Sequence, residues 1–289
     1  MAIYCIFGSW VLGKRTEIIV ISVLICGIIG YAGLGLALAG TRIADAEHTV
    51  NTVVSHQNTL NATFRSINIQ LTALGTTASF DGPQAISLVG TSVANAELAS
   101  RTVSHDEASL GAADSSLHAQ RWLTVVSNRA VERTTHRIGH ARAALAIVHS
   151  LAADQIQDGR FWLALYGSLS DLGDLNRQRD AGDTPGARQS LTKMSTDVAQ
   201  AEALAGTPGL PPELAALTAD LKKVVADYTR QLDAEAAGHY DAAAAISVDV
   251  SADMSQVAGF KVDGIAAKMD AFYRPRIDRY NQEIAAATA

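Results

Sequence analysis

The sequence predicts an all-α protein in which an N-terminal transmembrane helix continues into a bundle of long helices outside the cytoplasm. Three observations lead to this fold class. Residues Ile18 to Ala39 form a run of 22 residues without one charged side chain. Apolar residues then recur three and four positions apart through most of the remaining chain, which is the helical period. No stretch shows the sustained alternation of apolar and polar residues that indicates a strand.

The apolar run has the length of a membrane span, because about 20 residues cross ~30 Å of hydrocarbon. Lys14 and Arg15 precede it, and this excess of positive charge places the N-terminus in the cytoplasm. We expect a cytoplasmic or interfacial tail at 1–16, a transmembrane helix at 17–39 that binds the lipid bilayer, and a periplasmic or extracellular bundle at 40–289. An exported part that is rich in alanine and lacks cysteine fits a bacterial inner membrane.

Cleavage after the run is the alternative, because Ala37-Leu38-Ala39 resembles the small-residue site of a signal peptide. The apolar region of a signal peptide usually spans about 7–15 residues. This run is longer, so its length favours a retained anchor.

Charge and cysteine content exclude some functions of the exported part. The chain has 23 basic and 29 acidic residues, and its exported part, without Lys14, Arg15 and Glu17, has a net charge of −7. Nucleic-acid binding usually requires a basic patch, so we expect no nucleic-acid partner. Cys5 and Cys26 both precede residue 40, which excludes disulfides and cysteine-based metal sites beyond it.

The exported part begins with a helical stalk. Apolar residues from Ile43 to Leu74 follow a heptad pattern, and no proline separates them from the apolar run. This predicts one continuous helix from about Thr16 to Ala78, whose exported portion is ~55 Å long at 1.5 Å per residue. The residues 79–83 end that helix with glycine and proline, and a second helix begins near Gln84.

The second helix has polar residues on its apolar seam, namely Ser100, Glu107 and Asp114. Its boundary with the next helix is open between two positions, Gly111–Ser116 and Ser127-Asn128, because both contain N-cap residues.

Glycine and proline also mark the later turns. The third helix runs to about Arg179, and the turn at 180–185 is a candidate sub-boundary of the bundle. Two more helices flank a loop from Gly206 to Pro211. A last helix runs from the turn at 237–239 to the end, with Pro275 inside it and Phe272 and Ile277 in its apolar stripe.

One candidate metal site consists of Glu132, His136 and His140, which lie four residues apart along one helical face. Two histidines at this spacing can bind zinc. The general-base glutamate of HExxH is missing, and four nearby arginines would repel a cation, so the alternative is a solvated face of mixed charge.

A candidate partner contact lies in the sequence FYRPRIDRY near the C-terminus. Tyrosine and arginine are enriched at protein interfaces. The contact residues would be Phe272, Tyr273, Arg274, Arg276, Arg279 and Tyr280. The alternative is a helix end whose arginines extend along apolar surface.

The sequence contains no phosphate-binding glycine loop, no nucleophile elbow and no haem attachment motif. We therefore predict that the protein is not an enzyme and carries no cofactor.

The predicted plan of this chain is a short cytoplasmic tail, one membrane helix and a bundle of long helices outside. In this plan it resembles the four-helix sensory domains of bacterial chemoreceptors and sensor kinases. The residues that carry the resemblance are the junction at Gly40-Thr41-Arg42, the stalk heptads to Leu74, and the turns at 181–183 and 237–239. The resemblance covers architecture only, and no second membrane helix, HAMP-like segment or output module follows the bundle. It implies a sensor that signals through a separate membrane partner.

These features predict a protein that acts by protein–protein interaction, as an accessory subunit of a membrane complex or as an envelope scaffold. Its partner would be another membrane protein or a second copy paired through the stalk heptads. The alternative is a sensory bundle that binds a small ligand in a pocket between helices. Gln57, Glu107 and Asp114 are the polar seam residues that would line such a pocket.

Overall fold

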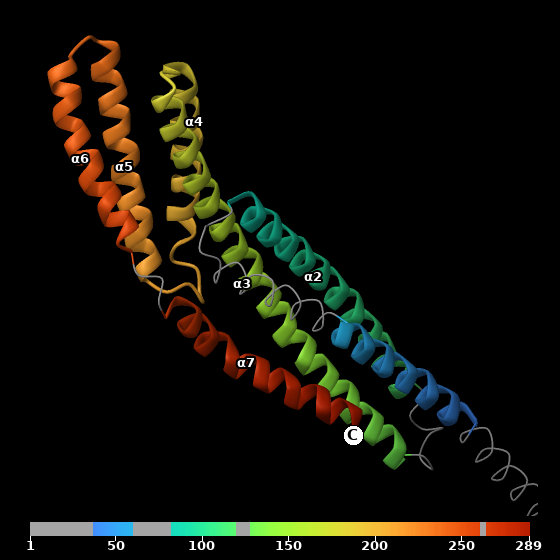
Figure 1. Cartoon of the computed structure of the whole chain (residues 1–289). Helices are drawn as coiled ribbons and strands as arrows, with labels where there is room; N and C mark the ends of the chain where they lie inside the picture. Colours follow the sequence, from blue (N-terminus) through green and yellow to red (C-terminus); the bar gives the residue numbers. More distant parts are fainter. Residues whose placement is uncertain (1–36, 60–81, 120–127, 261–263) are drawn as a thin grey trace, which may run out of the picture. The chain divides into compact units, whose positions relative to one another are not determined.

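The computed structural model describes residues 37–59, 82–119, 128–260 and 264–289, and all regular secondary structure in these ranges is helical (Figure 1). A first helix covers 37–59. Six more follow: α2 (Gly82–His118), α3 (Asn128–Asp180), α4 (Thr184–Leu204), α5 (Glu213–Ala236), α6 (Tyr240–Ala258) and α7 (Ile265–Thr288). The predicted all-α fold is confirmed for the described residues.

The predicted transmembrane segment lies almost wholly outside the described residues. Only the last three residues of the run Ile18–Ala39 are described, and they are helical. Among the helices that the structure describes, none is both long enough and apolar enough to cross a bilayer. The predicted stalk from residue 60 onward and most of its break at 79–83 also fall outside these residues.

The chain divides into two compact units, each assembled from segments that are distant in sequence. The described part of the first unit comprises 37–55, 106–119, 128–143 and 283–289. That of the second comprises 56–59, 82–105, 144–260 and 264–282. The candidate sub-boundary at 180–185 is a turn inside the second unit.

The first unit has a small apolar core, and one arginine, Arg137, links several of its segments. Ala46, Val50 and Val53 of the first helix are buried, as the heptad pattern predicted. The Nε of Arg137 on α3 donates to the carbonyl of Ala287 at 2.7 Å, and its guanidinium lies 3.7 Å from the Glu47 carboxylate. Arg137 therefore connects three of the four segments that form this unit.

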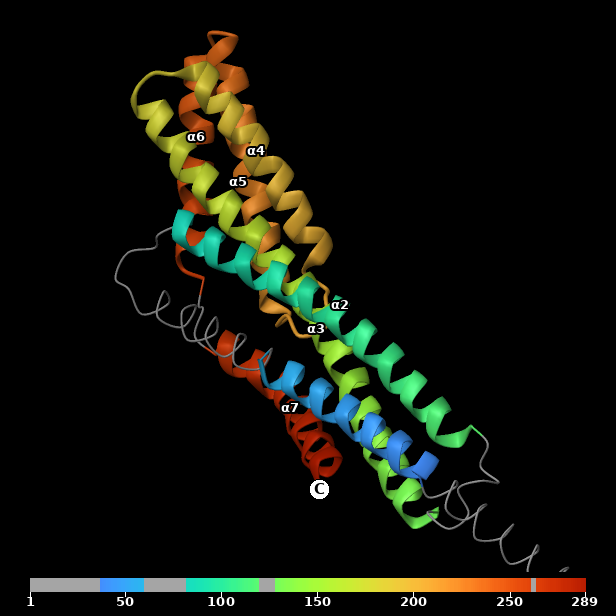
Figure 2. The same cartoon turned by 90° about the vertical axis from the view of Figure 1, so that its right-hand side faces the viewer.

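The second unit contains the larger apolar core. Its deeply buried large side chains include Phe161 and Leu175 of α3, Met194 of α4, and Leu221 and Leu232 of α5. The helix α4 packs against α5, and α6 folds back along α5 (Figure 2). These apolar positions recur at helical spacing, so their burial accounts for the helical hairpins.

Turn chemistry explains the reversal between α3 and α4. Gly182 has a φ of 75°, a conformation that glycine adopts without a steric penalty. Asp183 Oδ1 then accepts a hydrogen bond from the Gly186 N–H at 3.0 Å, which caps α4. Pro185 follows in the first turn, where a missing N–H costs nothing.

The structure bears on two predicted helix boundaries, the end of the second helix and the extent of the last one. The helix α2 continues to His118, so Gly111–Ser116 is not a break. The second predicted position, Ser127-Asn128, lies at the edge of the described residues, where the described part of α3 starts. The predicted last helix is wrong as a single element, because α6 ends at Ala258 and α7 begins at Ile265. Gly259 is the C-cap of α6, and Gly264, with a φ of 84°, precedes α7. Pro275 lies inside α7.

Candidate interaction site on helix α7

The part of α7 in the second unit, residues 265–282, packs against α3 through polar side chains. Tyr273 points to α3, where its hydroxyl donates a hydrogen bond to Asp158 Oδ2. Asp158 is buried, with 5% of its surface exposed. The phenol ring also lies against Gly209 of the loop before α5, whose φ is 101°. A Cβ at Gly209 would overlap the Tyr273 side chain, so this glycine makes room for the tyrosine.

Arg276 lies one turn beyond Tyr273 and binds the same face of α3. Its Nη1 donates to Asp154 Oδ2 at 2.6 Å and to Ser150 Oγ at 3.2 Å. Its guanidinium carbon is 4.7 Å from the centroid of the Phe272 ring and 5.1 Å from that of Tyr273. These cation–π contacts and the ion pair hold Arg276 in a fixed position.

We call Asp154, Asp158, Tyr273 and Arg276 the α3–α7 polar cluster. Burial raises the pKa of Asp158 from its ordinary 3.8 to about 6, although the Tyr273 hydrogen bond acts in the opposite direction. The charge of Asp154 raises this pKa further, and Arg276 lowers it. Burial, followed by donation to Asp158, also raises the pKa of the Tyr273 hydroxyl.

Two atoms of the cluster are buried without a hydrogen-bond partner in the described part of the chain. They are Asp158 Oδ1, an acceptor, and Arg276 Nη2, a donor. Since unpaired buried polar atoms cost free energy, the cluster is only partly satisfied.

Only part of the predicted contact set lies on the surface of α7. Tyr280 is buried at 8% exposure, and burial raises its pKa to about 12, so its assignment as a contact residue needs correction. Tyr273 and Arg276 are turned toward α3. Arg274 is exposed and pairs with Asp270 of its own helix, and Arg279 is exposed as well.

Phe272 and Ile277 remain as large apolar side chains on the surface, with exposures of 42% and 43%. We call Phe272, Arg274, Ile277 and Arg279 the exposed side chains of α7. Phe272 and Ile277 lie about 140° apart around the helix, at about 100° per residue, and therefore on the two sides of its contact with α3. Sequence reasoning placed Ile277 in an apolar stripe, because periodicity alone does not indicate which side of a helix has a neighbour.

Sequence reasoning also missed the two carboxylates on α3. A signal was present, because Asp158 interrupts the buried stripe that includes Ala152, Phe161 and Leu165. A carboxylate at such a position requires a polar partner from another helix.

The three candidate metal ligands do not converge. Glu132 Oε1 accepts a hydrogen bond from Asn128 Nδ2 at 2.8 Å, and His140 Nδ1 lies 2.8 Å from Glu283 Oε2 on α7. His136 is exposed on the same helix. Within the described ranges, no group of three or more histidine, cysteine, aspartate or glutamate side chains is arranged to hold a metal ion. The spacing places these residues on one face, but two of them bind other side chains.

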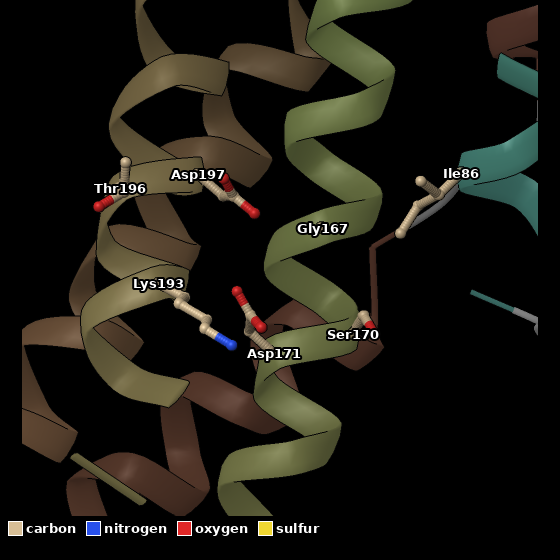
Figure 3. A pocket seen from close by; sticks show the side chains of 7 residues that line it. All are labelled: Ile86, Gly167, Ser170, Asp171, Lys193, Thr196 and Asp197. Carbon is tan, nitrogen blue, oxygen red and sulfur yellow. The ribbon is translucent and has the colours of Figure 1, made fainter. Parts of the chain in front are cut away.

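An open depression of about 410 Å³ lies between α3 and α4 (Figure 3). Asp171 of α3 and Asp197 of α4 extend into it from facing helices, and Lys193 reaches toward Asp171. Burial raises the pKa of both carboxyl groups, and the charge of Asp197 adds to the effect on Asp171. Gly167 also lines it, and a Cβ there would overlap the Asp197 carboxylate.

The polar seam residues that were expected to line a pocket do not line this depression. Gln57 is buried, Glu107 is exposed and Asp114 is half-buried. On α2 the buried acidic residue is Asp106 and not Glu107. The buried side of α2 therefore passes one position before the residue predicted from the sequence to lie on it.

Comparison with protein-family models, curated proteins and solved structures finds no match to this chain.

Proposed function

We propose that the chain is a single-pass membrane protein whose extracytoplasmic helical bundle acts by protein–protein interaction. It serves as an accessory subunit of a membrane complex or as an envelope scaffold. The observation that carries this proposal is that Phe272 and Ile277 of α7 are exposed, one on each side of the contact that the α3–α7 polar cluster makes with α3. Rigid aromatic side chains and arginine are typical of interface hot spots.

The membrane anchor of this proposal rests on the run Ile18–Ala39, which is long enough to span a bilayer. The last three residues of this run are described and are helical, and they continue without a loop into the helix at 40–59. Ala39, at 1% exposure, is already part of the packed first unit. Helical structure without an intervening loop is what a stalk that leaves the membrane would require. The positive charges at Lys14 and Arg15 support a cytoplasmic N-terminus and a periplasmic or extracellular bundle in a bacterial inner membrane.

The test is affinity purification of the full-length protein from mild-detergent membranes, followed by mass spectrometry. We expect a partner, another membrane protein or a second tagged copy, to co-purify in fixed ratio with the wild type. Replacement of Phe272 and Ile277 by alanine should reduce its recovery by about tenfold or more, because losing hot-spot side chains costs over ~1–2 kcal/mol each. The matched control is Val248→Ala, which removes an exposed side chain from α6. Equal recovery with all three proteins would contradict the proposal.

A sensory bundle that signals through a separate membrane partner is the second candidate. The depression between α3 and α4 favours it, because Asp171 and Asp197 face one another there and would attract a small cationic ligand. The plan of a membrane helix followed by long helices, which resembles bacterial sensory domains, also supports it.

Thermal unfolding of the full-length protein with putrescine or spermidine tests this candidate. A ligand that binds the folded state raises the melting temperature by mass action. We expect a rise that disappears in the Asp171→Asn, Asp197→Asn double variant. Unchanged melting of the wild type over millimolar diamine would exclude small polyamines as ligands of this depression.

A further inference from the structure

The α3–α7 polar cluster contains two carboxylates and only one cation. Arg276 is paired with Asp154 at 2.6 Å. Asp158 has a hydroxyl partner, Tyr273, at one oxygen and none at the other within the described residues. With both carboxylates ionised the cluster has a net charge of −1, and one proton on Asp158 makes it neutral.

No other cation in the described part of the chain is bound to Asp158. From α3 it is faced by Asp154, and from α7 by Tyr273 and Arg276. The adjacent Gly159 packs against Val93 of α2, which carries no charge. The nearby Arg160 points elsewhere and pairs with Glu97 of α2 at 3.5 Å. The loop before α5 contributes Gly209.

The rest of α7 in this unit makes few deeply buried contacts. Ile265 and Tyr280 are its buried side chains, and Met269 is partly buried against the core. Glycines at 259 and 264 flank the connection to α6, and the second has a φ of 84°. The polar cluster is therefore a large part of what holds this helix to α3.

We propose that the docking of α7 on α3 is proton-linked, so that one proton bound at Asp158 holds the helix in place and its loss loosens the helix. The physical reason is that deprotonation leaves an uncompensated negative charge at a buried helix contact. Loosening would change how the exposed side chains of α7 are presented to a partner. That consequence rests on the proposed function, whereas the proton linkage itself does not.

The direction of the effect follows from the pKa. In the docked state it is about 6, and in an undocked, solvated state it returns toward 3.8. Because the docked state binds the proton more tightly, docking is strongest below pH 4, weakens as the pH rises through about 6, and is constant above it. Between pH 5 and pH 7 the opening equilibrium should rise about tenfold.

Hydrogen–deuterium exchange of the full-length protein in detergent, read by mass spectrometry on peptides from 265–282, tests this proposal. After correction for the intrinsic exchange rate, we expect α7 of the wild type to lose about tenfold in protection between pH 5 and pH 7. Asp158→Asn, which stays neutral, should give the same protection at both values. The control Asp253→Asn replaces a carboxylate on α6 whose pKa is raised by burial, outside the cluster, and should keep the wild-type response.

A second variant keeps the test decisive if Asp158→Asn does not fold. Tyr273→Phe removes the hydrogen bond that lowers the pKa of Asp158, so the change in protection should extend to higher pH. Wild-type protection of α7 that does not change with pH, or a Tyr273→Phe profile that coincides with the wild type, would overturn the proposal. If no partner co-purifies but the protection of α7 still changes with pH, the proposed function is contradicted and the proton linkage is not.

Discussion

Single side chains determine how α7 is attached to α3. Tyr273 fits between Asp158 on one side and the backbone of Gly209 on the other. Two independent features of position 209 require glycine. Its φ is positive, which strains any side chain, and the Tyr273 ring occupies the place where a Cβ would lie.

Gly209→Ala should therefore destabilise the protein by about 1–3 kcal/mol, because alanine is strained at φ 101° and its Cβ would displace the tyrosine. Chemical denaturation of the purified protein measures this. Gly206→Ala is the matched control in the same loop, since its Cβ would enter open space at an ordinary φ. Equal losses in the two variants would show that the loop, and not the fit to Tyr273, is responsible.

Arg276 is the one cation of the polar cluster, and its removal should have a pH-dependent cost. We expect Arg276→Ala to lower the free energy of unfolding by roughly 2–3 kcal/mol at pH 7, where Asp154 loses its ion-pair partner and the buried Asp158 loses the nearby positive charge. The loss should be smaller at pH 4, because Asp158, with a pKa raised to about 6, is then neutral. Denaturant titrations at the two pH values provide the measurement, and a loss that is the same at both would contradict the assigned charges.

Helix ends account for the main hairpin of the second unit. The helix α4 starts where Gly182 reverses the chain and Asp183 binds the Gly186 N–H. The turn was recognised from its glycine, aspartate and proline, because these residues act through local backbone chemistry that needs no tertiary information.

Removal of the cap should cost about 1 kcal/mol. Asp183→Ala leaves the Gly186 N–H without its side-chain acceptor, whereas Asp183→Ser retains an oxygen that can accept this bond. Thermal unfolding monitored by circular dichroism should show a lower melting temperature for the alanine variant and a nearly unchanged one for the serine variant. A serine variant as unstable as the alanine variant would mean that the carboxylate acts by its charge rather than as a cap.

The sequence was less informative where the outcome depends on a neighbour. The break between α6 and α7 was missed, because the apolar spacing continues across Gly259 and Gly264 and a single glycine is tolerated inside a helix. The exposure of Ile277 and the burial of Tyr280 depend on which side of α7 meets α3. The candidate metal site had suitable spacing, but the proximity of His140 to Glu283 joins positions 143 residues apart.

The proposed membrane anchor concerns the whole chain and rests on the run Ile18–Ala39. We expect the full-length protein to remain in the membrane pellet after alkaline carbonate extraction. Ile25→Arg together with Ile29→Arg should release it or prevent insertion, because each arginine near the centre of a span costs about 2.5 kcal/mol or more. The same positions changed to leucine form the control. A measured intact mass equal to that of a chain beginning at Gly40 would instead support cleavage after Ala39.

The two units also restrict how this chain can be divided and in what order it can be completed. Neither unit is a continuous piece of sequence, since each takes segments from both halves of the chain. The bond from Arg137 to the carbonyl of Ala287 closes the first unit across 150 positions. During synthesis the first unit can therefore be completed only after residue 287 has left the ribosome. No single cut of the chain yields a fragment that contains one whole unit and nothing of the other.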